Sequence, residues 1–291
     1  MKTWDLIKLT ALAKRTNGRA EIAVGLIDGP VTITHPGLMT ENIREVPGRL
    51  PGVCSRASSI ACMHGTKVAG ILSGRRTSQV AGICPGCTLL VRPIFSETSA
   101  QKNNMPNTTP AQLAEAIVDT VKAGAKIINM SMGLEKTSLS RQRVIEEALN
   151  YAARRGVIVV AAAGNQGMLT SSTVTRYPWV IPVVAYNYQG RPMQLSNLSQ
   201  SIGRLGLGAS GDDMVSLNAA GGLSIFSGTS AATPFVTGAI ALLWSEFPSA
   251  SAVEIKNALL GAVNAARHSV VPPLLNAEAA YQQLKQTIRR N

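Results

Sequence analysis

The stretch Val157-Ile-Val-Val-Ala-Ala-Ala163, seven apolar residues between Gly156 and Gly164, decides the fold. Its apolar residues do not alternate with polar ones, which is typical of a strand that is buried on both faces. Four further short runs share this character, at residues 22–27, 89–94, 126–130 and 180–186. Such strands predict a parallel sheet with helices on both sides.

Helical periodicity fills the intervals between these strands. Residues 110–123 place Leu113, Ile117 and Val121 four residues apart on one side, and Gly124 can end the helix. Further helices are predicted at residues 140–155, 229–246, 252–260 and 277–288. The alternation predicts an α/β fold of three layers, in which helices flank a mostly parallel central sheet.

Composition limits the classes of protein to consider. Apolar residues make up 45% and charged residues 15% of the 291, which excludes a disordered chain. No apolar run approaches the ~20 residues that a membrane span needs, and charges are spread through the first 14 residues, so no signal peptide is expected. We expect a helical arm at residues 1–20, one domain at residues 21–291, and a cytoplasmic protein.

The net charge of +12 raises the question of an acidic partner. Nucleic acid is not expected, because the basic residues are scattered rather than clustered with aromatic ones. Small arginine pairs occur at residues 75–76, 154–155 and 289–290. No membrane partner is expected either, and the sequence leaves the oligomeric state open.

The four cysteines do not form a disulfide scaffold. Cys84 and Cys87 have the C-x-x-C spacing, but Cys54 and Cys62 offer no matching second pair for zinc. Reduced thiols or one local disulfide are the expected states.

Polar residues stand where predicted strands end and helices begin. Asp28 follows the first strand, Ser131 and Asn165 follow the third and fourth, and His64 and Ser230 each open a helix. The carboxyl ends of parallel strands form the ligand-binding edge of an open sheet. Each residue alone has a structural explanation as a turn or helix-cap residue. Together they provide a hydroxyl nucleophile, its base and a carboxylate that orients the base.

The motifs around these residues resemble those of the subtilisin-like serine proteases over residues 20–285. They are Val24-Gly-Leu-Ile-Asp28-Gly, His64-Gly-Thr-Lys-Val-Ala-Gly70, Asn129-Met-Ser-Met-Gly133, Val160-Ala-Ala-Ala-Gly164-Asn165 and Gly228-Thr-Ser-Ala-Ala-Thr-Pro234. The resemblance implies a serine endopeptidase that works through an acyl-enzyme. In it Asp28 orients His64, His64 acts as base and then acid, Ser230 attacks, and Asn165 with the Ser230 N–H binds the oxyanion.

The resemblance also implies a substrate-binding set. Residues 131–133 would pair as an edge strand with an extended substrate, although an ordinary interior strand is the alternative. The others would line the pocket for P1, the residue before the scissile bond, where we expect Arg176 to favour an acidic or polar side chain. The set comprises Ser131, Met132, Gly133, Ala163, Gly164, Thr175 and Arg176.

A narrower resemblance connects the chain with the patellamide-type proteases that mature cyanobactins. It rests on Asp28-Gly-Pro-Val with His35-Pro, on Ala61-Cys-Met-His64 and on the stretch at residues 80–90. His35 is expected to be a turn residue. Those enzymes cut ribosomally made precursor peptides, and one class also joins the new ends into a ring. The implied function is maturation of a precursor peptide, whose acidic leader would suit the positive charge.

Three alternatives stay open: general protein degradation, peptide ligation or macrocyclisation, and peptide binding without catalysis. Cyclising relatives carry a large insertion between the Asp and His motifs, whereas only 36 residues separate Asp28 from His64 here, which favours hydrolysis. The loop at residues 73–80 carries Arg75 and Arg76 where subtilisins usually bind calcium, and arginine is no ligand for a hard cation. We expect neither metal nor cofactor.

Overall fold

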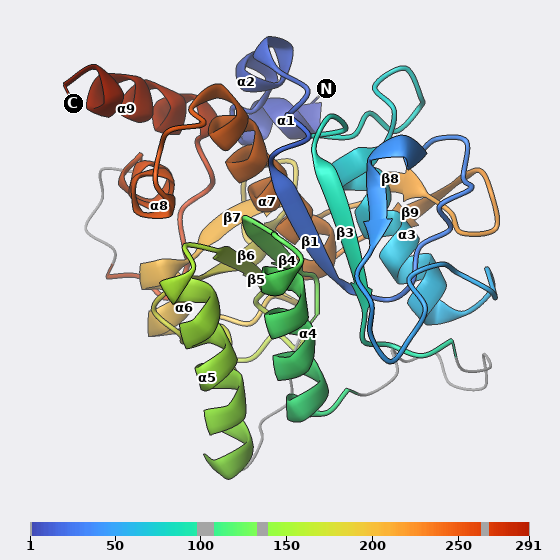
Figure 1. Ribbon diagram of the computed structural model, residues 1–291. Helices are drawn as coiled ribbons and strands as arrows, with labels where there is room; N and C mark the ends of the chain where they lie inside the picture. The colour runs from blue at the N-terminus through green and yellow to red at the C-terminus, as the bar shows by residue number, and fades with distance from the viewer. Residues whose placement is uncertain (1, 98–107, 133–138, 263–267, 291) are drawn as a thin grey trace.

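The computed structural model describes residues 2–97, 108–132, 139–262 and 268–290 (Figure 1). Among these residues the main sheet has seven strands in the order β2-β3-β1-β4-β5-β6-β7, and every neighbouring pair is parallel. The predicted three-layer α/β fold is confirmed. The strands are β1 (Ala23–Asp28), β2 (Ile43–Glu45), β3 (Thr88–Pro93), β4 (Ile127–Met130), β5 (Ile158–Ala162), β6 (Val180–Tyr186) and β7 (Leu207–Ser210).

Helices cover both faces of the sheet (Figure 1). On one face α3 (Ile60–Ser73) and α7 (Thr229–Glu246) pack together, and on the other α4 (Pro110–Lys122) packs against α5 (Leu139–Arg154). The strands feed two separate cores, because successive side chains point to opposite faces. Leu26 belongs to the core beneath α7, whereas its neighbour Ile27 belongs to the core beneath α4.

Smaller elements surround these layers. An antiparallel hairpin of β8 (Met214–Leu217) and β9 (Leu223–Phe226) lies against α3 and leads into α7. The remaining elements are α1 (Lys2–Leu6), α2 (Thr10–Arg15), η1 (Thr40–Asn42), α6 (Gln200–Leu205), α8 (Ala252–Gly261) and α9 (Ala277–Arg290). No helix in the described ranges is long and apolar enough to cross a bilayer.

The N-terminal helices α1 and α2 belong to the main body. Ile7, Leu9 and Leu12 are fully buried, and they share one core with α7. Contacts of α2 with α7 and α9 fix the segment further.

Two histidines were assigned local positions from the sequence, and the structure confirms only the position of His35. His64 does not open its helix: α3 begins at Ile60, because the Ser59 side chain caps it by accepting from the Cys62 N–H. His35 is the turn residue that was expected. Its Nδ1 accepts from the Gly37 N–H at 3.0 Å, and its Nε2 lies 3.2 Å from the Gly222 carbonyl oxygen.

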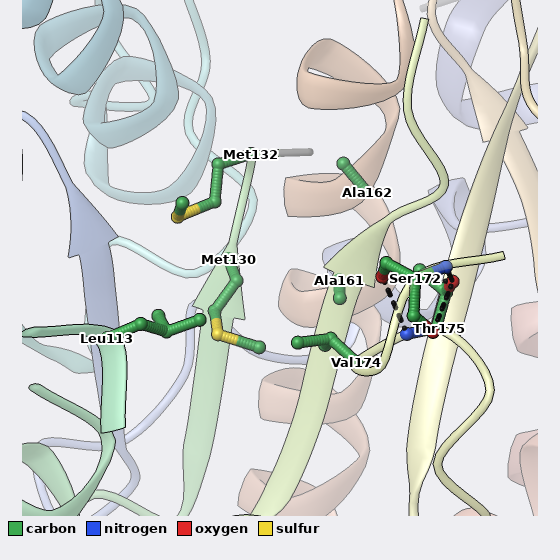
Figure 2. Close-up of a pocket in the computed structure, with 8 residues that line it drawn as sticks. All are labelled: Leu113, Met130, Met132, Ala161, Ala162, Ser172, Val174 and Thr175. Carbon is green, nitrogen blue, oxygen red and sulfur yellow. Dashed lines mark hydrogen bonds between the residues drawn. The ribbon is translucent and has the colours of Figure 1, made fainter. Parts of the chain in front are cut away.

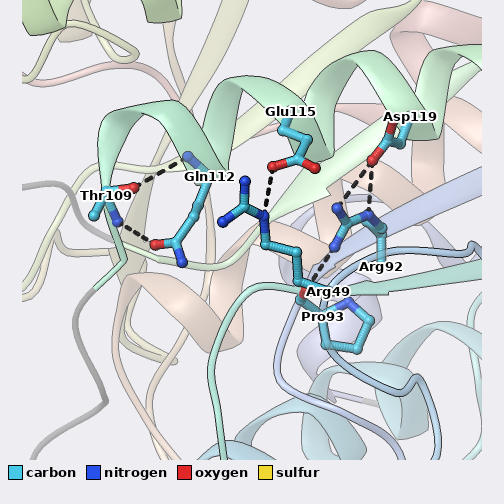
Figure 3. Close-up of polar contacts among 7 residues, drawn as sticks. All are labelled: Arg49, Arg92, Pro93, Thr109, Gln112, Glu115 and Asp119. Carbon is cyan, nitrogen blue, oxygen red and sulfur yellow. Dashed lines mark hydrogen bonds and ion pairs between the residues drawn. The ribbon is translucent and has the colours of Figure 1, made fainter.

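The segment between β2 and α3, residues 46–59, is held down along its length. Figure 3 shows Arg49 of this segment reaching α4, where its Nε donates to Glu115 Oε2 at 3.1 Å. Arg92, on the neighbouring strand β3, reaches the same helix, with its Nη2 donating to Asp119 Oδ2 at 2.9 Å. A disulfide joins Cys54 to Cys62 on α3. The ion pair therefore ties this short segment to α4, and the disulfide ties it to α3.

The disulfide settles the state of one cysteine pair. Among the described residues, Cys54, Cys62 and Glu97 form a group close enough to hold a metal ion. The two sulfurs are bonded to each other, however, and Glu97 accepts from the backbone N–H groups of Ser55 and Arg56. The disulfide and the Glu97 carboxylate thus hold residues 54–56 in place. Cys84 and Cys87 are free thiols and are buried.

Candidate active site

The end of β1 and the second turn of α3 bring a carboxylate and an imidazole together. His64 Nδ1 donates to Asp28 Oδ1 at 2.6 Å, and the Gly29 N–H donates to the same oxygen at 2.7 Å. The Asp28 side chain is fully buried and that of His64 is 15% exposed. Oδ2 of Asp28 has no partner among the described residues, so the imidazole is one of only two donors to a buried carboxylate. This bond fixes the ring and places its proton on Nδ1.

Two glycines permit this approach. A side chain at Gly29 would come within 2.0 Å of the Ala61 carbonyl oxygen, and one at Gly65 within 2.4 Å of the Gly29 carbonyl oxygen. The backbone after β1 therefore touches α3 directly. Any larger residue at either position would push His64 away from Asp28.

The start of α7 presents Ser230. The side chain is 8% exposed, and its N–H is among the first of the helix, which have no carbonyl of an earlier turn to donate to. Pro234 lies inside the helix and lacks an N–H, so the Ser230 carbonyl loses its usual helical donor. The Ser230 N–H is thereby left for a substrate to use.

The side-chain oxygen of Asn165 holds this residue beside the start of α7. Its Oδ1 accepts from both the N–H and the hydroxyl of Thr229 at 2.9 Å. The Thr229 hydroxyl also accepts from the Gly164 N–H at 3.3 Å. Asn165 is exposed, and its Nδ2 donates to none of the described residues. The side chain thus presents a fixed N–H donor next to Ser230.

The hairpin brings the segment that leads to Ser230 against His64. The ring of Phe226, which ends β9, meets the His64 ring edge-on with centroids 5.2 Å apart. Ser230 follows four residues later. No hydrogen bond joins His64 Nε2 to Ser230 Oγ in the described part of the chain, and such bonds often tighten only when substrate binds.

A hollow opens between the ends of β4 and β5 (Figure 2). Its enclosed space is only about 10 Å³, which is about the space that one water molecule takes. Its walls are mostly apolar, and the two hydroxyl residues bond to each other, the Ser172 N–H donating to Thr175 Oγ1 at 2.8 Å. The lining residues are Leu113, Met130, Met132, Ala161, Ala162, Ser172, Val174 and Thr175. Such a hollow suits a short, uncharged side chain.

The predicted substrate-binding residues fare differently. Met132 and Thr175 line the hollow. Ser131 is buried, with its Oγ accepting from Asn129 Nδ2 at 2.9 Å, so only its backbone can serve a substrate. Ala163 and Gly164 continue from β5 toward Asn165, and Gly133 lies outside the described residues.

Arg176 does not reach the hollow. Its Nη2 donates to Gln142 Oε1 at 2.6 Å and lies 3.6 Å from Glu146 Oε1, both on α5. The positive charge is met there, so the structure offers no support for Arg176 as a selector of acidic P1 residues.

In the loop at residues 73–80, the Arg76 side chain binds the surrounding carbonyl oxygens. Arg76 donates to the backbone carbonyls of Gly82 and Ile83 in its own loop, and to those of Ala13 and Thr16 in the N-terminal segment. A guanidinium thus supplies a positive charge among carbonyl oxygens, and burial lowers its pKa.

Sequence reasoning missed three kinds of site residue. Thr229 was visible inside the Gly-Thr-Ser motif, but its bridging of Gly164 and Asn165 needs the fold. Phe226 has no signal of its own, since a single aromatic residue at the end of a short apolar run is common in cores. The walls of the hollow contributed by Leu113 and Met130 come from segments whose periodicity only indicates burial.

Known proteins share both the sequence and the fold. Residues 19–278 match the subtilase family of peptidases. A thermophilic serine proteinase of Bacillus sp. (strain AK1) is 32% identical over 84% of this chain, which spans 57% of that protein's length. Subtilisin Savinase of Lederbergia lenta is 30% identical over 95% of this chain and 97% of its own.

Solved structures agree. The protease domain of PatA, in a serine-to-alanine mutant, is 32% identical with a TM-score of 0.83, covering 93% of this chain and 97% of that one. The prenylagaramide maturation protease PagA is 30% identical with a TM-score of 0.82, covering 95% and 98%. The PatG macrocyclase domain, at 20% identity and a TM-score of 0.78, shares the fold, covering 95% of each chain. The chain belongs to the subtilase family and is a subtilisin-like serine protease.

Proposed function

We propose that this protease cleaves peptide bonds through Asp28, His64 and Ser230. The observation that carries the proposal is the 2.6 Å bond between His64 Nδ1 and the fully buried Asp28 carboxylate. It leaves Nε2 as the acceptor that a neighbouring serine needs. Ser230 Oγ attacks the substrate carbonyl as its proton passes to His64 Nε2, and Asp28 stabilises the resulting imidazolium.

The oxyanion formed in this step meets two N–H donors. Asn165 Nδ2 is held in place because Oδ1 of the same side chain is bonded to Thr229, and the Ser230 N–H comes from the first turn of α7. His64 then gives its proton to the leaving amine, and the amine departs. Water, deprotonated by the same imidazole, hydrolyses the acyl-enzyme.

The proposed substrate is a ribosomally made precursor peptide. Support comes from the two maturation proteases, which at 32% and 30% identity resemble this chain more closely in sequence than the macrocyclase domain at 20%. The short, fastened segment at residues 46–59 supports release by water, since ring closure requires an acyl-enzyme shielded from it.

The proposed P1 residue is small and uncharged, and the proposed leader is acidic. The hollow has apolar walls and no free charge of its own, because Arg176 is paired on α5. A net charge of +12 would steer an acidic leader toward the enzyme in a salt-dependent way. We propose a cytoplasmic location, where such precursors are made.

The test is cleavage of a synthetic peptide with an acidic leader and alanine or serine at P1. We expect two linear products whose summed mass exceeds that of the substrate by one water, and no cleavage by Ser230→Ala. We also expect KM to rise with salt for the acidic peptide and to stay constant for a neutral-leader control. Head-to-tail cyclic product would establish ligation instead, and a salt-independent KM would remove the acidic leader.

A further inference from the structure

Phe226 is in contact with the base but belongs to the segment of the nucleophile. It is 8% exposed and packs in the core beneath α7. Its ring stands at 88° to the His64 ring with a centroid distance of 5.2 Å. Edge-to-face pairs at this separation are attractive and restrict both rings.

A second residue of α3 holds the same aromatic ring. Lys67 Nζ lies 5.5 Å from the Phe226 centroid and donates to the neighbouring Ile225 carbonyl at 3.3 Å. Side chains three residues apart share one side of a helix, so His64 and Lys67 bracket the ring together. Ser216 on β8 adds a backbone fastening by donating from Oγ to the Lys67 carbonyl at 2.6 Å.

We infer that Phe226 is a positioning residue for His64, an inference that rests on the proposed catalytic function. Asp28 fixes only Nδ1, and a ring held at one nitrogen can still swing about its side-chain bonds. Phe226 supplies a wall against that swing. Because Ser230 follows four residues later, the wall and the nucleophile are carried by one short piece of backbone between β9 and α7.

The orientation of His64 matters in the chemical step. His64 takes the Ser230 proton only as the bond to the substrate carbonyl forms, and substrate binding does not require this transfer. A contact that acts only in the chemical step raises the maximal rate without tightening substrate binding. Phe226 is therefore expected to affect the maximal rate and to leave half-saturation unchanged.

The experiment measures labelling of Ser230 by a fluorophosphonate probe at increasing probe concentrations. We compare the wild type with Phe226→Leu, which keeps an apolar side chain, and with Phe226→Tyr, which keeps the aromatic ring. Val215→Ala is the matched control, because Val215 is on the same hairpin but is 49% exposed. Melting temperatures show whether each variant is folded.

We expect Phe226→Leu to lower the maximal labelling rate about tenfold with half-saturation unchanged, and Phe226→Tyr and Val215→Ala to stay within twofold of the wild type. If Phe226→Leu does not fold, Lys67→Met, which releases one side of the ring, is expected to slow labelling two- to threefold. Equal maximal rates in the leucine variant, no rescue by tyrosine, or an equal loss in Val215→Ala would overturn the inference. An unlabelled wild type would instead overturn the catalytic function itself.

Discussion

Replacing Arg76 with methionine should weaken the attachment of the N-terminal helices and lower the free energy of unfolding, whereas replacing its neighbour Arg75 should change it little. Arg76 donates to four backbone carbonyls in two segments, and its guanidinium lies 5.4 Å from the centre of the Trp4 ring. Methionine keeps an unbranched side chain but has no donor. The four carbonyls then have to find water or remain unpaired.

The size of the effect follows from these contacts. A typical intramolecular hydrogen bond contributes about 1 kcal/mol net, and a half-exposed cation–π contact adds about 0.5 kcal/mol. Four bonds and the ring contact give about 4.5 kcal/mol for Arg76→Met. Arg75 forms an ion pair with Glu41 at 3.4 Å, and both side chains are substantially exposed, at 42% and 54%. Arg75→Met should therefore cost less than about 1 kcal/mol.

Urea denaturation and thermal melting measure the difference. At roughly 2–4 °C per kcal/mol for a domain of this size, Arg76→Met should melt about 9–18 °C below the wild type and Arg75→Met within about 4 °C of it. A chelator in the buffer should leave the wild-type melting temperature unchanged, since Arg76 supplies the positive charge in this loop. A loss below about 1 kcal/mol for Arg76→Met, or an equal loss for Arg75→Met, would refute the reasoning.

Three further outcomes are expected. Asn165→Ala should lower kcat about 10²–10³-fold, a magnitude known from subtilisin itself, with KM nearly unchanged in a peptide assay; an unaltered kcat would remove Asn165 from the oxyanion site. Peptides with alanine or serine at P1 should be cleaved at least about tenfold faster than those with phenylalanine, and Thr175→Gly should narrow this ratio; an unchanged ratio would place the P1 pocket elsewhere. Lys256 lies over the Trp179 ring, and burial lowers the pKa of its ammonium to about 8. Between pH 8 and 10.5 the unfolded chain then binds more protons than the folded one, so Lys256 should make the free energy of unfolding rise with pH, by up to about 3 kcal/mol; an equal rise in Lys256→Met would contradict this.

Burial explains which strands could be predicted. β5 and β6 are continuous apolar runs because both faces are covered, and their predicted bounds nearly match the observed ones. β2 escaped prediction because it has three residues, two of them charged, and lies at the edge of the sheet. Only its pairing with β3 defines it as a strand.

The candidate site divides in the same way. Asp28, His64 and Ser230 could be singled out because each lies within a specific motif, although His64 lies in the second turn of α3 and not at its start. The direction of Arg176 could not, since its partners Gln142 and Glu146 are on a helix about thirty residues earlier in the chain. Long-range side-chain pairing leaves no local signal.

Cysteine pairing shows the same limit. Spacing allowed either reduced thiols or a local disulfide, and the fold decides because it brings Cys54 to the first turn of α3 with a Cα–Cα separation of 5.7 Å to Cys62. The buried Cys84 and Cys87, which have the more suggestive spacing, remain free.

The most direct test of the account is the site of fluorophosphonate labelling. The intact, folded wild type should gain one label per chain, and mass spectrometry of its peptides should place that label on Ser230. Ser230→Ala should melt at the same temperature as the wild type and remain unlabelled. His64→Ala should label at least about 10³-fold more slowly than the wild type. A folded wild type that does not label, or a label that persists in Ser230→Ala, would contradict the assignment of Ser230 as the nucleophile.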